Sequence, residues 1–123
     1  MITGTLLAES LRVGATIEVP GLFIRSLRRE DVSASTTGAQ PDVWTILEFE
    51  APPEAAGALT EAFSSGLLAE GGWYADFRAD DEHVVVFAGK VFRYPVGDEA
   101  GRAAAQEYGR SVGVPEHQLD WGA

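Results

Sequence analysis

The chain contains no cysteine, which excludes disulfide bonds, thiol catalysis and thiolate metal sites. Basic residues are also scarce, since nine lysines and arginines stand against nineteen aspartates and glutamates and leave a net charge of −10. A chain with this excess of negative charge repels phosphate backbones and anionic membrane surfaces. We therefore expect neither nucleic acid nor a membrane among its partners.

Long apolar runs are missing as well. No window reaches the ~18 apolar residues of a membrane helix, and residues 1–14 lack a basic region and carry Glu9 within their short apolar run. These residues therefore do not have the form of a signal peptide, and a cytoplasmic protein is expected. A chain of 123 residues, 46% of them hydrophobic, is sufficient for one domain, residues 1–123. Such a domain buries about two-thirds of its surface.

What the sequence does contain is a run of short strands, Trp73 to Pro95, with large side chains on both faces. Trp73 and Phe77 are expected to point to one face of the sheet and Tyr74 to the other. A sheet with one solvated face alternates apolar with polar residues, whereas a sheet that is apolar on both faces must be covered on both. Because only two helices are predicted, the pattern indicates a further layer from a partner or a ligand.

Turn residues and side-chain periodicity divide the chain into strands and helices. For residues 3–11 a strand is favoured over a short helix, and the small polar segment 30–42 is predicted to be a mobile loop. The predicted strands cover residues 3–11, 22–28, 43–50, 73–78, 84–88 and 91–94.

Two helices are predicted, over residues 52–68 and 98–112. A proline pair suits the first turn of one helix, and Asp98 is a good N-cap for the other. The second helix is expected to bury a stripe of side chains at helical spacing. That stripe is Ala100, Ala104, Tyr108 and Val112.

These elements predict an α+β fold with the order β-β-β-α-β-β-β-α, ferredoxin-like in its general character. The expected architecture is a two-layer sandwich, in which a mostly antiparallel sheet of five or six strands carries the two helices. If both helices lie on one face, the other face exposes aromatic rings, and an exposed apolar patch of that size usually marks an interface. The first functional hypothesis is therefore a non-enzymatic binding module that forms a homodimer or binds a protein partner. The expected contact residues are Trp44, Ile46, Tyr74, Phe92 and Tyr94.

An acidic cleft around Asp76 and His83 supports a second hypothesis, a small enzyme. Asp76 lies in the middle of a predicted strand, where a carboxylate can serve in acid–base chemistry or pair with a cross-strand cation. Both histidines have acidic neighbours, His117 through an H-x-x-D spacing to Asp120. A metal site needs ligands that converge, so solvated turns explain this pattern better, and no metal or cofactor is predicted.

A third hypothesis is an anion-binding sensor that uses Arg25, Arg28 and Arg93. The alternative is that these arginines are solvated charges that offset nearby acids.

The stretch from Gly72 to Trp121 also resembles a small bacterial domain family of unknown function. The similarity is carried by GGWYADF, VVFAGKVFRYP-x-GD and GVPEHQLDW. The resemblance implies that this stretch is one structural unit. It implies no activity, cofactor or site.

Overall fold

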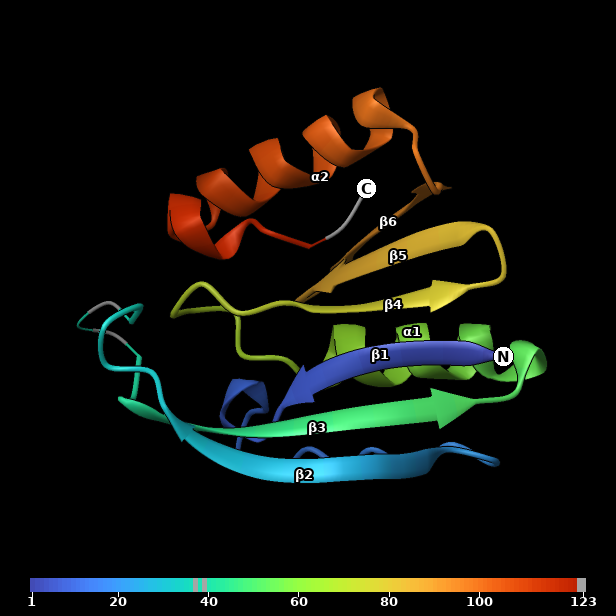
Figure 1. Cartoon of the computed structure of the whole chain (residues 1–123), viewed down its shortest axis with the longest axis horizontal. Helices are drawn as coiled ribbons and strands as arrows, with labels where there is room; N and C mark the ends of the chain where they lie inside the picture. Colours follow the sequence, from blue (N-terminus) through green and yellow to red (C-terminus); the bar gives the residue numbers. More distant parts are fainter. Residues whose placement is uncertain (37, 39, 122–123) are drawn as a thin grey trace.

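The computed structural model describes residues 1–36, 38 and 40–121. Its six strands form one antiparallel sheet in the order β2-β3-β1-β4-β5-β6 (Figure 1). The strands are β1 (Ile2–Leu7), β2 (Phe23–Asp31), β3 (Val43–Ala51), β4 (Ala75–Ala79), β5 (Glu82–Phe87) and β6 (Lys90–Pro95). The helices are α1 (Ala56–Gly66) and α2 (Glu99–Ser111), with 3-10 turns η1 (Ala8–Ser10), η2 (Pro53–Ala55) and η3 (Glu116–Gln118).

The predicted α+β sandwich and the order β-β-β-α-β-β-β-α are confirmed in the described residues. The ferredoxin-like arrangement is not confirmed. The first strand of the chain, β1, occupies the middle of the sheet, where Ile2 pairs with Ala51 of β3 on one side and Ala79 of β4 on the other. Of the predicted strand over residues 3–11, only the part up to Leu7 is a strand, and a 3-10 turn follows it.

One face of the sheet is covered by α1. Leu59 and Phe63 of this helix are buried, and the Phe63 ring lies 5.7 Å from Phe49 and 6.3 Å from Phe77, measured between ring centroids. Strand residues of the same parity, such as Ile2, complete this core. Full burial of aromatic and branched side chains here is the main stabilising contribution to this half of the fold.

The opposite face carries α2 and the segment that follows it. Val85 and Phe87 point to this side of β5, whereas their neighbours Val84 and Val86 point to α1, so the strand is apolar on both faces for a structural reason. The ring centroids of Phe87 and Tyr108 are 5.0 Å apart. The two helices thus lie on opposite faces, and the chain itself covers both sides of the β4–β6 half of the sheet. The argument for a homodimer through a bare aromatic face therefore loses its basis.

Close packing of α2 depends on small residues. Asp98 caps the helix by accepting a hydrogen bond from the Gly101 amide at 3.1 Å. The residues that face the sheet are Ala105 and Gly109, and a Cβ at Gly109 would lie 2.8 Å from Leu119 Cδ2. Of the expected buried stripe, Tyr108 and Val112 do pack against the core, whereas Ala100 and Ala104 are exposed.

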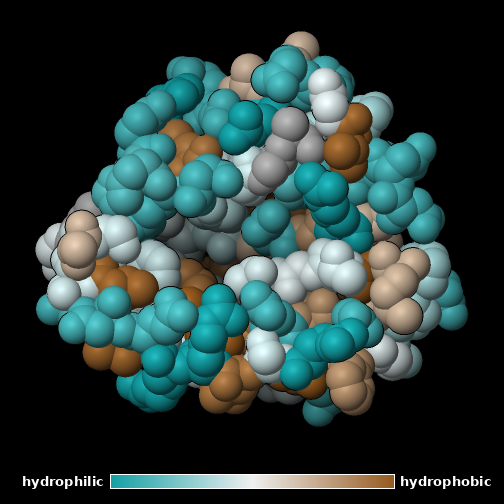
Figure 2. Space-filling model, viewed as in Figure 1, coloured by the Kyte–Doolittle hydropathy of each residue, from teal (hydrophilic) through white to brown (hydrophobic). Residues whose placement is uncertain are grey.

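Towards β2, the α2 face of the sheet is left open. Figure 1 shows α2 above the β4–β6 end, with β1, β3 and β2 extending away from it. The space-filling view in Figure 2 shows a recess on this face, between the part that contains α2 and the lower strands. The candidate site lies in this recess.

Candidate functional site

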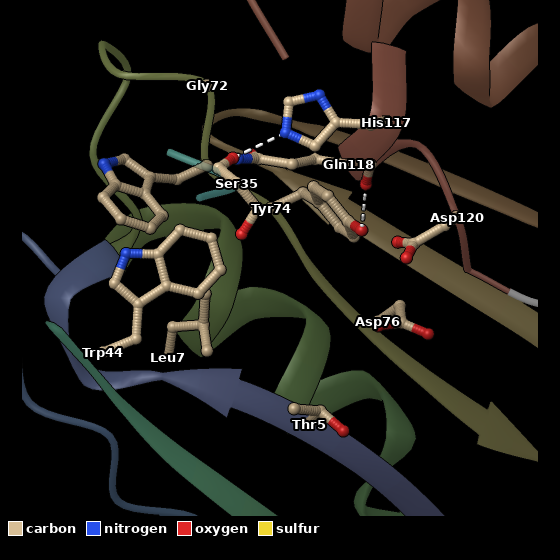
Figure 3. A pocket seen from close by; sticks show the side chains of 11 residues that line it. Thr5, Leu7, Ser35, Trp44, Gly72, Tyr74, Asp76, His117, Gln118 and Asp120 are labelled. Atoms are coloured by element: carbon tan, nitrogen blue, oxygen red, sulfur yellow. Dashed lines mark hydrogen bonds between the residues drawn. The ribbon is translucent and has the colours of Figure 1, made fainter. Parts of the chain in front are cut away.

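The recess contains a pocket of ≈ 220 Å³ that is assembled from distant parts of the sequence. Strands β1, β3 and β4 provide its floor, the residues just before β4 form one wall, and the segment around η3 forms another (Figure 3). The lining residues are Thr5, Leu7, Ser35, Trp44, Gly72, Trp73, Tyr74, Asp76, His117, Gln118 and Asp120.

Two indole rings form one end of the pocket. The ring centroids of Trp44 and Trp73 lie 5.6 Å apart with an angle of 58° between the ring planes. Trp73 is placed by a sharp turn, in which Gly72 has a φ of 73° and a Cβ would come within 2.6 Å of the Gly113 carbonyl oxygen. Only glycine fits this position, because the backbone conformation is left-handed and the neighbouring chain is in contact.

Asp76 is held on the floor of the pocket by a buried histidine. His83 is 1% exposed, and its Nε2–H donates to Asp76 Oδ2 at 2.9 Å. The imidazole ring also lies 5.5 Å from the Tyr94 ring, centroid to centroid. Its Nδ1 has no hydrogen-bond partner within the described part of the chain. The single bond to His83 therefore fixes the orientation of a carboxylate that remains accessible from the pocket.

Tyr74 reports the electrostatic character of the pocket. Its hydroxyl donates to the Gln118 carbonyl at 2.6 Å (Figure 3). Burial raises the pKa of the Tyr74 phenol well above its usual range, and the negative charges of Asp76 and Asp120 raise it further. No lysine or arginine is among the described residues that line the pocket. The pocket is therefore an anionic site with aromatic walls.

Polar contacts close the upper end of the pocket. His117 Nε2–H and the Gln118 side-chain amide both donate to the Ser35 carbonyl, at 2.6 and 2.7 Å. The Gln40 and Gln118 side chains exchange hydrogen bonds of 3.1 and 2.9 Å, and Gln40 also donates to the Gly71 carbonyl at 2.8 Å. The predicted mobile loop is thereby attached to the C-terminal segment, although its residues 37 and 39 lie outside the described part.

A second, more open recess of ≈ 470 Å³ continues along the strands and shares Thr5 and Asp76 with the pocket. Its charges are mixed. Arg25 pairs with Glu50 at 2.6 Å on its floor, and Arg78 and Glu48 line it as well. The two recesses together form a continuous concave surface across β1, β3 and β4, which we call the concave face.

The structure separates the predicted site residues into groups. It brings Asp76 and His83 together, and it places Trp44 and Tyr74 in the same pocket. Ile46 and Tyr94 are buried inside the chain, at 8% and 3% exposure, so they offer no surface to a partner. Phe92 packs beneath α2, with its ring centroid 5.6 Å from Tyr108.

The three arginines of the anion-sensor hypothesis do not converge. Arg28 forms ion pairs with Glu30 and Glu48 on one side of the sheet, beside Arg25. Arg93 of β6, at the opposite edge of the sheet, pairs with Glu82 of β5. We therefore find no common anion site for these residues.

Sequence reasoning missed the contributions of Thr5, Leu7, Gln118 and Asp120 to the pocket. Asp120 had a signal in its spacing to His117, and both residues line the same cavity. Among the described residues no three histidine, aspartate or glutamate side chains are grouped so as to hold a metal ion.

No family model, curated protein or solved structure matches the chain. The resemblance over residues 72–121 thus receives no support from them. Within the described residues, no helix has the length and apolar character needed to cross a membrane.

Proposed function

We propose that this protein is a non-enzymatic binding module that holds a segment of a partner protein on its concave face. The observation that carries the proposal is the aromatic pocket that opens into a longer groove on the one part of the sheet that α2 leaves uncovered. Interfaces are enriched in tryptophan and tyrosine at their centres and are polar at their rims. Trp44, Trp73 and Tyr74 at one end, with the mixed charges of the second recess beyond them, fit that pattern.

The rigidity of the site also favours binding. Trp73 is buried, Tyr74 is bonded to Gln118, and Asp76 is bonded to His83. Side chains that are already ordered lose little conformational entropy when a ligand arrives, so more of the contact energy is available as affinity. A chain that stabilises its own pocket in this way is suited to recognition.

A phage-displayed library of random peptides tests the proposal. Peptides selected on the native protein are expected to bind Trp44→Ala at least about tenfold more weakly than the wild type, because central aromatic residues dominate interface energies. Leu27→Ala is the matched control, since Leu27 is exposed on the opposite side of the sheet. Circular dichroism confirms that both variants fold. Selected peptides whose affinity is the same for Trp44→Ala and the wild type would refute the proposal.

The bond between Asp76 and His83 favours a second candidate function, a small hydrolase. In that case Asp76 is the general base that accepts a proton from an attacking water, and His83 is its positioning residue. Turnover of p-nitrophenyl esters, phosphodiesters or glycosides that disappears in Asp76→Asn would support this candidate. Equal turnover by the wild type and Asp76→Asn, or none with any of these substrates, would count against it.

A further inference from the structure

The polar groups of the pocket are mostly acceptors. Asp76 uses Oδ2 to accept from His83, which leaves Oδ1 for a ligand. Tyr74 donates its proton to the Gln118 carbonyl and also lies in hydrogen-bonding contact with the Asp120 carboxylate, so its oxygen offers a ligand only an acceptor. Asp120, in the wall formed by the segment around η3, adds a second exposed carboxylate. The exception is the buried Trp44 Nε1–H, a donor with no partner among the described residues. A ligand that supplies mainly donors is the chemical complement of this set.

The charge of the pocket selects a cation among such ligands. Two carboxylates line it, those of Asp76 and Asp120. Among the described residues, neither lysine nor arginine lines it. The raised pKa of Tyr74 has the field of Asp76 and Asp120 among its causes. The net charge of −10 extends this field over the molecule and speeds the approach of positively charged partners.

The aromatic rings distinguish between kinds of cation. Two indoles and a phenol line the cavity, and the negative faces of such rings attract a cation within about 6 Å. A guanidinium group is planar, weakly hydrated and stacks on aromatic rings, whereas an ammonium group is compact and strongly hydrated. A volume of ≈ 220 Å³ is small beside the ~300–1,000 Å³ of typical ligand pockets, which suits the tip of one side chain.

We infer that the pocket formed by Trp44, Trp73, Tyr74, Asp76 and Asp120 receives the guanidinium group of an arginine from the partner segment. This inference rests on the proposed function and identifies the ligand of the same site. Asp76 and Asp120 accept hydrogen bonds from the guanidinium nitrogens, and the aromatic rings flank its plane. The remainder of the partner segment lies along the second recess.

Replacement of arginine by citrulline tests the inference, because citrulline has nearly the same shape but no charge. A library-selected peptide is synthesised with arginine, citrulline, lysine or norleucine at its basic position, and binding is followed by tryptophan fluorescence. We expect the arginine peptide to bind on the order of tenfold more tightly than the citrulline peptide. Lysine is expected to be intermediate, and the preference for arginine should decline as salt is raised.

Asp120→Asn should reduce the preference for arginine over citrulline several-fold. Glu116→Gln is the matched control, since it removes one negative charge from the same segment at a residue that pairs with Arg110 outside the pocket. Asp120 is exposed, so its amide variant is expected to fold. Equal binding of arginine and citrulline peptides, with loss of both in Trp44→Ala, would overturn this inference and leave the binding module intact. If Trp44→Ala binds both peptides as tightly as the wild type does, this inference and the proposed binding module are both overturned.

Discussion

Individual side chains in this protein are fixed by one or two specific hydrogen bonds. Glu9, in the turn after β1, accepts from the Thr45 amide at 2.6 Å and from the Thr45 hydroxyl at 2.8 Å. Burial of the carboxylate opposes its ionisation, but these two bonds, together with the Glu9 backbone amide and the charge of Arg29, outweigh that effect and lower the pKa of Glu9. A single carboxylate thus fastens η1 to β3.

Glu9→Gln is expected to reduce the free energy of unfolding by about 1 kcal/mol at pH 7, because a hydrogen bond to a charged acceptor is replaced by one to a neutral amide. A group with a lowered folded-state pKa stabilises the protein above its unfolded pKa and loses this effect as the pH falls through its folded pKa. The difference in unfolding free energy between Glu9→Gln and the wild type should therefore disappear in strong acid. Urea unfolding at neutral and acidic pH measures it, with Glu70→Gln as the exposed control. An effect that does not depend on pH would contradict this account.

The second residue-scale prediction concerns Tyr94 and Trp121. The Trp121 indole N–H donates to the Tyr94 hydroxyl at 2.9 Å, and both side chains are buried. Tyr94→Phe leaves that donor unsatisfied and is expected to cost about 1–3 kcal/mol of unfolding free energy. Tyr108→Phe is the control, because Tyr108 is half-buried at the edge of the same cluster. Equal stability of the two variants in urea unfolding would be inconsistent with this prediction.

At the scale of elements, β1 and α2 depend on glycines for close packing. A Cβ at Gly4 of β1 would lie 2.6 Å from the Asp76 carbonyl oxygen and 2.6 Å from Phe49 Cζ, so the rings of the α1 core fill the space beside this residue. Gly109 plays the same part in α2. Both elements lie as close to their neighbours as the backbone allows.

Gly4→Ala is expected to destabilise the protein by about 1–3 kcal/mol, because a backbone carbonyl on β4 must move to make room. Gly57→Ala is the matched control, since Gly57 is an exposed helical residue of α1 with open space around its Cβ position. That variant should gain about 0.5–1 kcal/mol from the better helix propensity of alanine. Thermal unfolding compares them, and a stabilised Gly4→Ala would contradict the packing described for β1.

Strands and helices could be predicted because periodicity and turn residues are local signals. The face of α2 could be predicted only in part, because glycines at positions 101 and 109 carry no apolar side chain to mark it. The pocket was also inaccessible to this reasoning. Its residues come from β1, β3, β4 and the segment after α2, and they meet only because β1 inserts between β3 and β4. Asp76 and His83 were the exception, since a short hairpin brings them together.

At the scale of the whole molecule, three exposed apolar side chains lie along the sheet edge formed by β2. Phe23, Ile24 and Leu27 of β2 are exposed at 61%, 44% and 63%. Val43 of β3 is also exposed, but it pairs with Asp31 at the other end of β2. In β2, arginines precede acids along the strand. Pairing of two copies through this edge is a different contact from the predicted homodimer, whose expected contact is the aromatic face.

We expect light scattering at high protein concentration to give twice the 13.1 kDa mass of one chain, and Leu27→Lys to return the mass to that of one chain. Val96→Lys is the control, because Val96 is an exposed apolar residue that follows β6 at the other edge. A mass of one chain at every concentration, or a double mass that persists in Leu27→Lys, would exclude this dimer.

The central position of β1 has a consequence for the kinetics of folding. Both strands that pair with β1 follow it in the sequence. Its pairing with β4 joins Ile2 to Ala79, so the loop that it closes contains most of the first two-thirds of the chain. Closing such long loops is entropically costly, so these contacts form slowly. The hairpins β2–β3 and β4–β5 can assemble early, as separate local units. Docking of β1 between them should then set the overall rate, and its amides should gain protection from hydrogen exchange last.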